Sequence, residues 1–128
     1  MFQQVTKGIK ISVLTKYEGA FLKKNILNHA FRYTVRIENQ SKDVVQLINR
    51  NWKIMESNHR PHYVEGAGVI GKKPVLKSGE IHTYQSNCIL NSPIGAMSGF
   101  YTMVNFSSAQ EFEVEIPTFK LAATFALN

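Results

Sequence analysis

The sequence has one cysteine, no long apolar run and few acidic residues. The single cysteine, Cys88, cannot form an internal disulfide, which is typical of proteins in a reducing compartment and makes the cytoplasm the expected location. No apolar stretch approaches the roughly 18 to 20 residues that a transmembrane helix needs, and residues 1–13 lack the continuous apolar core of a signal peptide. We therefore expect a cytoplasmic protein without a membrane span.

Helical periodicity is also missing, and a period of two takes its place. Apolar and polar residues alternate through 8–17 and again through 30–39, as in strands that bury one face. Further strands are predicted at 44–55, 62–66, 80–86, 99–106 and 111–116. About seven short strands separated by turn residues predict an all-β fold, an antiparallel β-sandwich of the immunoglobulin or fibronectin type III type. A small barrel is the competing architecture, and Trp52 is expected in the core.

Length and composition fit one folded domain that spans residues 1–128. The chain is 44% hydrophobic, and a domain of this size buries roughly two thirds of the surface that its unfolded chain exposes. The 15 basic residues outnumber the 9 acidic ones, which favours anionic partners. They form no run longer than Lys23-Lys24 and Lys72-Lys73. The excess therefore also fits simple solubilising charge, and a nucleic-acid partner is not expected without a basic stripe.

Residues 66–71, GAGVIG, match the glycine pattern G-x-G-x-x-G that holds a dinucleotide pyrophosphate in Rossmann folds. Such a site needs a helix directly after the glycines, because the helix amides hold the phosphates. Pro74 and then Ser78-Gly79 prevent a helix here, and residues 86–91 contain no ribose-binding acid. The pattern therefore does not predict a dinucleotide site, and no cofactor is expected.

Two interpretations of the glycine segment remain. Closely spaced glycines in an all-β chain usually serve a turn, a bulge or a close approach of two backbones, and we favour this interpretation. Successive amides in such a turn can also form a concave anion site. In that second hypothesis, Gly66, Gly68 and Gly71 hold a phosphate, a pyrophosphate or an acidic side chain. Lys72 and Lys73 would add positive charge beside it.

Metal-ligating residue types recur just before the glycines. His59, His62 and Glu65 follow one another at steps of three, and two imidazoles with a carboxylate suit zinc, nickel or cobalt. Asn58 and Pro61 indicate a hairpin connection, in which such steps do not converge. We therefore favour solvated loop residues and keep a metal site at these three residues as the alternative hypothesis.

No catalytic signature accompanies these residues. Cys88 lies in the apolar setting CIL, which predicts a buried and unreactive thiol. The chain has a single Asp, Asp43, and no G-x-S-x-G nucleophile motif. We expect a protein without enzymatic activity.

Several longer motifs together resemble the bacterial ApaG family. They are RNWKI (50–54), VEGAGVIGKKPVLKSGE (64–80), YQS (84–86), SPIGAMSGFYTMV (92–104) and FEVEIPTFKL (112–121). The resemblance implies a fibronectin type III-like fold, in agreement with the strand pattern, and carries over no established enzymatic activity. It also implies a phosphate or pyrophosphate ligand at Gly66, Gly68 and Gly71. Bacterial members are linked to cobalt resistance and magnesium efflux, and related domains serve as protein-interaction modules.

The sequence thus predicts a non-enzymatic binding domain with an unknown protein partner or a phosphate-containing or acidic ligand. The alternative is an accessory role in cobalt and magnesium tolerance and efflux. A phosphoanhydride-acting enzyme is the third hypothesis. It is disfavoured because the sequence shows no carboxylate cluster that would hold magnesium.

Overall fold

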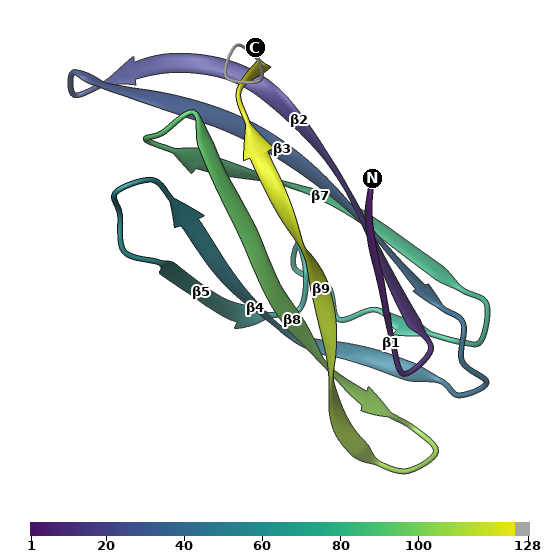
Figure 1. Cartoon of the computed structure of the whole chain (residues 1–128). Helices are drawn as coiled ribbons and strands as arrows, with labels where there is room; N and C mark the ends of the chain where they lie inside the picture. The colour runs from purple at the N-terminus through teal and green to yellow at the C-terminus, as the bar shows by residue number, and fades with distance from the viewer. Residues whose placement is uncertain (125–128) are drawn as a thin grey trace.

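The computed structural model describes residues 1–124, which form nine β-strands (Figure 1). The strands are β1 (Phe2–Thr6), β2 (Ile9–Lys23), β3 (Ile26–Asn39), β4 (Val45–Glu56), β5 (His62–Ala67), β6 (Val75–Leu76), β7 (Ile81–Leu90), β8 (Ile94–Asn105) and β9 (Gln110–Ala122). No helix among the described residues is long and apolar enough to cross a membrane.

The strands form two antiparallel sheets that pack face to face. The first sheet has the order β1-β2-β3-β7, and the second has the order β5-β4-β8-β9, with the short β6 paired to β4. Figure 1 shows the two layers of strands, and the buried apolar residues form one core cluster that draws on strands of both sheets. The predicted all-β sandwich is confirmed. The competing barrel is wrong, because the strands divide between two separate sheets.

The strand pattern of the sequence misses some of the structure. It does not predict β1, whose middle residues are exposed, or β6, which has only two residues. The pattern also ends one strand at residue 17 and begins the next at residue 30, whereas β2 extends to Lys23 and β3 begins at Ile26. The two strands continue to a tight turn at Lys24 and Asn25, whose φ angles of 51° and 62° are those that two-residue hairpin turns require.

Aromatic rings fill the centre of the sandwich. Trp52 is 4% exposed, as predicted for a core residue. Its ring centroid lies 5.3 Å from Tyr33 of the first sheet, and 5.9 Å from Phe119 and 6.4 Å from Tyr101 of the second. The contact with Tyr33 joins the two sheets, and edge-on aromatic pairs add stability beyond the area that they bury.

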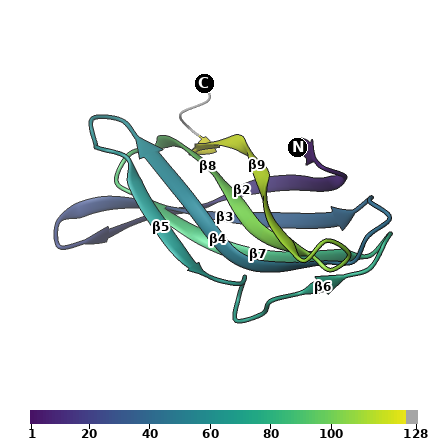
Figure 2. The same cartoon turned by 90° about the horizontal axis from the view of Figure 1, so that it is seen from below.

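The two lateral sides of the sandwich differ. On one side β1 and β9 bring the sheets together, where the rings of Phe2 and Phe119 lie 6.2 Å apart and the amide of Glu115 donates to Thr6 Oγ1 at 3.2 Å. On the other side β5 and β7 each pair with one neighbouring strand only. Figure 2 shows the segment between β5 and β6 at this open side. The open side therefore presents both free strand edges and the glycine segment.

A bulge and a glycine shape the second sheet. The register between β8 and β9 shifts between Met97 and Gly99, opposite Pro117, which has no amide to donate to the ladder. Gly99 pairs with Trp52, and a Cβ on Gly99 would overlap the carbonyl oxygen of Asn51. β4 and β8 therefore approach closely at the middle of this sheet.

Candidate functional site

The first candidate is the glycine segment on the open side. Gly66 lies on β5 opposite Arg50 of β4, and a Cβ on Gly66 would stand 2.6 Å from Arg50 Nη2. Arg50 Nη1 donates to the carbonyl oxygens of Ala67 and Gly68, both at 3.0 Å. Gly66 is thus the residue that lets the Arg50 guanidinium lie against the backbone and hold the start of the loop.

Gly68 and Gly71 have different tasks in the same loop. Gly68 has a φ of +63°, and a Cβ there would overlap the carbonyl oxygen of Lys72. Val69 and Lys72 exchange two main-chain hydrogen bonds of 2.8 and 3.0 Å. They enclose Ile70 and Gly71, whose φ angles of 46° and 71° make a two-residue hairpin turn. The segment is therefore a tight turn fixed by hydrogen bonds.

The hydrogen bonds of this turn limit how it can hold an anion. The amide of Gly68 donates to the Ile48 carbonyl oxygen at 2.7 Å, and the amides of Val69 and Lys72 bond each other's carbonyl oxygens. Within residues 1–124, the amides of Ile70 and Gly71 donate no hydrogen bond. Binding of an anion at the turn stays a prediction. The groups that can bind it are these two amides and the ammonium groups of Lys72 and Lys73.

Positive charge is present beside the turn. The pKa of His82 on β7 is lowered, first because burial disfavours its charged form and second because the Lys72 ammonium repels it. Lys72 and Lys73 form no ion pair with a carboxylate of the described chain. Their charges are therefore available to a ligand at the end of the turn.

The structure does not bring the three predicted metal ligands together. His59 lies in the turn after β4, where its Nδ1 is 2.7 Å from the Ser57 carbonyl oxygen. His62 and Glu65 lie on β5 an odd number of residues apart, so they point to opposite faces of the sheet. Across residues 1–124 no three His, Cys, Asp or Glu side chains are grouped as metal ligands.

The carboxylate of Glu56, next to these residues, has a structural task that the sequence does not reveal. Its Oε1 accepts hydrogen bonds from the amides of Asn91 and Ser92 at 2.9 and 3.1 Å, and from Ser92 Oγ at 3.0 Å. It therefore ties the end of β4 to the turn between β7 and β8.

Buried polar groups in the core are held in their neutral forms. Burial, and second the charge of Glu56, raises the pKa of the Cys88 thiol to about 11. The hydroxyl groups of Tyr84 and Tyr101 are hydrogen-bonded to each other, and burial raises both of their pKa values. The sequence prediction that Cys88 is buried is confirmed.

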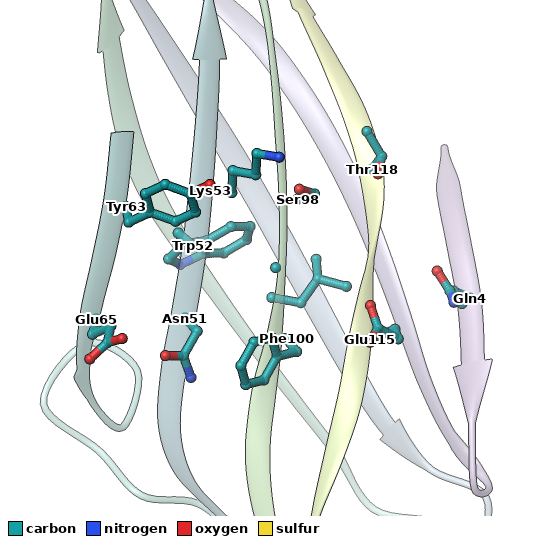
Figure 3. Close-up of a pocket in the computed structure, with 12 residues that line it drawn as sticks. Gln4, Asn51, Trp52, Lys53, Tyr63, Glu65, Ser98, Phe100, Glu115 and Thr118 are labelled. Atoms are coloured by element: carbon teal, nitrogen blue, oxygen red, sulfur yellow. The ribbon is translucent and has the colours of Figure 1, made fainter. Parts of the chain in front are cut away.

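A second candidate, which the sequence does not indicate, is a groove on the outer face of the second sheet (Figure 3). It has a volume of about 450 Å³. One row of side chains crosses four strands of this face, because each residue pairs with the next: Glu65, Asn51, Phe100 and Glu115. A hollow of about 350 Å³ shares Asn51 and Glu65 with the groove and continues it along β4 and β5.

The neighbouring row of the groove is Tyr63, Lys53 and Ser98. The Tyr63 side chain is 66% exposed and stands beside Lys53 in Figure 3. Thr118 of β9 and Gln4 of β1 close the far end. The groove thus combines aromatic rings, two carboxylates, two side-chain amides and one ammonium group in a single depression.

Alternation in the sequence places groove residues such as Asn51, Lys53 and Glu115 on the polar side of their strands. It does not say which strands are neighbours, or which residues pair across them. The groove depends on that register and therefore becomes visible only in the folded chain.

The two antiparallel sheets define a fibronectin type III-like β-sandwich. A family model described as the ApaG domain matches residues 21–105. Curated proteins named Protein ApaG from Beijerinckia indica and Methylocella silvestris are each 40% identical to this chain. The alignments cover 98% of this chain and 96% and 95% of the two relatives. The chain therefore belongs to the ApaG family.

Solved structures agree with this assignment. A crystal structure from Bordetella pertussis, described as an ApaA protein, is 36% identical and has a TM-score of 0.80 over 91% of this chain and 94% of its own. A structural-genomics X-ray structure is 32% identical and has a TM-score of 0.86 over 91% of this chain and 88% of its own.

Proposed function

We propose that this chain is a non-enzymatic binding domain of the ApaG family. The Cys88 thiol, a candidate nucleophile, is buried, and its raised pKa keeps it protonated and unreactive. The hydroxyl groups of Tyr84 and Tyr101 are hydrogen-bonded to each other inside the core. In contrast, β5 and β7 offer free edges to which an extended partner segment can add as a further strand.

We further propose that its ligand carries a phosphate, a pyrophosphate or another acidic group, bound at the turn of residues 69–73. The observation that carries this proposal is the pair Lys72 and Lys73 at the end of a turn fixed by hydrogen bonds, without an ion pair to a described carboxylate. A fixed turn lets both ammonium groups act without the ordering cost of a mobile loop. The free amides of Ile70 and Gly71 supply further donors.

Titration calorimetry with pyrophosphate and with nucleotides tests this site. The chain contains a matched control, since Lys23 and Lys24 form a second lysine pair at a tight turn. Replacing Lys72 and Lys73 by Ala is expected to weaken pyrophosphate binding about tenfold or more, because hydrogen bonds to charged groups are lost. Replacing Lys23 and Lys24 by Ala should leave the heats unchanged.

Two results would contradict this ligand assignment. Equal weakening by both double variants would show non-specific attraction of anions to a basic protein, and equal heats for the parent and the Lys72/Lys73 variant would remove the site. Pyrophosphate binding at this exposed site should also weaken when the titration is repeated at higher ionic strength, because salt screens the lysine charges.

A further inference from the structure

We propose that the outer-face groove of the second sheet binds an arginine side chain of a partner peptide in extended conformation. This site is separate from the lysine turn and takes a ligand of the opposite charge. It is built from the row Glu65, Asn51, Phe100 and Glu115, with Tyr63 in the row beside it.

The charge of this face is opposite to that of the whole chain. The formal net charge is +6, yet the groove is lined by two carboxylates, of Glu65 and Glu115, against the single ammonium of Lys53. Neither carboxylate forms a hydrogen bond or an ion pair with another side chain of the described residues. Both are therefore free to accept from a cationic ligand.

The aromatic rings select a flat cation. Phe100 pairs with Glu115 on one side and with Asn51 on the other. Paired strands lie about 4.8 Å apart, so a cation on the Phe100 ring is within reach of the Glu115 carboxylate. Attraction to a ring face acts within about 6 Å of its centroid. A guanidinium stacks on aromatic faces and bonds a carboxylate through two parallel N–H groups, which an ammonium does not do.

The open edge of β5 explains why the arginine would come from an extended peptide. β5 pairs only with β4, so its other side is free to bond a further strand. Alternate side chains of an added strand project to the outer face, next to Tyr63 and Glu65 of β5. From that position an arginine reaches Glu65 at the β5 end of the groove. Phe100 and Glu115 lie two and three strands beyond β5, about 10 and 15 Å away, so the peptide crosses the face of the sheet for another of its arginines to stack there.

A second copy of this chain fits the groove less well. The arginines on the outer face of the first sheet, Arg32 and Arg36, already pair with Glu18 and Glu38. Docking that face on the groove would join two different surfaces of the chain, and such a contact forms either a closed ring or an open chain of copies rather than a symmetric dimer. Self-association is therefore an outcome that the experiment must separate.

A blocked pentapeptide, Arg-Ser-Arg-Ser-Arg, is the probe, and its counterpart with neutral citrulline in place of arginine is the control ligand. Binding is followed by two-dimensional NMR of the isotope-labelled protein. We expect shifts of the Asn51 side-chain amide and of the Gly99 main-chain amide with the arginine peptide only. Glu115→Gln and Tyr63→Ala should each raise Kd about two- to fivefold.

The chain again offers matched controls. Glu113 projects from β9 on the same face as Glu115 but lies outside the groove, so Glu113→Gln removes the same charge and should leave Kd nearly unchanged. Lys53→Met removes the ammonium that competes with the ligand and should lower Kd. This variant distinguishes the proposal from an anionic ligand, for which the same change would raise Kd.

Several results would overturn the proposal. They are equal effects of Glu113→Gln and Glu115→Gln, binding of the citrulline peptide, a raised Kd in Lys53→Met, and the absence of shifts in the groove. Sedimentation of the protein alone completes the test. Concentration-dependent association that Glu115→Gln abolishes would assign the groove to a second copy instead.

Discussion

The glycine segment and the outer-face groove differ in what their polar groups already do. In the glycine segment, the amide of Gly68 donates to Ile48 and the Arg50 guanidinium donates to the carbonyl oxygens of Ala67 and Gly68. In the groove, the carboxylates of Glu65 and Glu115 have no partner side chain among the described residues. In the first region most of the main-chain polar groups stabilise the conformation of the turn itself, apart from the amides of Ile70 and Gly71, whereas in the second region the carboxylates have no partner within the described chain.

This difference shows why a visible motif is a weak guide to binding. Gly66, Gly68 and Gly71 look like one pattern, but they serve a packed guanidinium, a close backbone approach and a left-handed turn, respectively. The groove has no motif at all, because its residues come from separate strands and meet only through cross-strand pairing. In a β-sandwich, a binding surface on a sheet face is therefore built from residues that pair across neighbouring strands.

The largest expected effect is the loss of stability on replacing Gly68 by Val. Its φ of +63° is costly for any residue with a Cβ, and that Cβ would overlap the Lys72 carbonyl oxygen. Left-handed strain contributes about 1 to 2 kcal/mol and overpacking another 1 to 3 kcal/mol, approximately. We expect the free energy of unfolding, measured by urea denaturation, to fall by about 3 kcal/mol or more.

Two control variants sharpen this comparison. Gly71 also has a positive φ, of 71°, but the space around its Cβ position is open, so Gly71→Ala should cost only about 1 kcal/mol. Tyr63→Ala in the groove should change stability by less than about 0.5 kcal/mol, because this side chain is mostly exposed. If Gly68→Val and Gly71→Ala cost the same, the close approach to Lys72 does not matter.

A smaller loss is expected from Arg50→Met, which keeps an apolar stem and removes the guanidinium. Arg50 Nη1 bonds two loop carbonyl oxygens at 3.0 Å each, and hydrogen bonds to a charged group contribute more than neutral ones. Because the site is partly exposed, we expect a loss of about 1 to 2 kcal/mol in urea denaturation. An unchanged midpoint would mean that water replaces the guanidinium without cost.

How far the sequence predicts this fold depends on burial. The strands predicted at 8–17 and 30–39 from their regular alternation are confirmed, since residues 9–17 lie in β2 and 30–39 in β3. β1 escapes prediction because its exposed Gln3 and Gln4 carry no period-two signal. The outer halves of the β2–β3 hairpin escape because they extend past the core, where burial no longer imposes a pattern on residues such as Leu22 and Leu27.

The sequence identifies the residues of the candidate sites to different degrees. The lysine turn is contiguous in sequence, so its residues are identifiable in advance, although the use of its amides is not. The expectation that His59, His62 and Glu65 lie at a hairpin connection, where steps of three do not converge, agrees with their places in the turn after β4 and on β5, where His62 and Glu65 point to opposite faces. The groove needs the pairing of Asn51 with both Glu65 and Phe100, which no local pattern contains.

The smallest expected effect is a dependence of stability on pH that arises on the lysine-turn side. Burial, and second the Lys72 charge, lowers the pKa of His82 below its ordinary value of 6.5. As pH falls below about 6.5, the unfolded chain takes up a proton at this residue before the folded chain does. The free energy of unfolding therefore falls with acidification until the folded state is protonated too.

Substitutions separate the two causes of this pH dependence. His82→Gln should flatten the decline in unfolding free energy measured between about pH 7 and pH 5, and His62→Gln, which removes an exposed histidine of β5, should keep it. Lys72→Ala should flatten the decline only in part, since burial is the larger cause of the lowered pKa. If Lys72→Ala left the pH dependence of the unfolding free energy unchanged, the Lys72 ammonium would not contribute to the lowered pKa of His82. The ammonium would then lie farther from His82 than in the structure.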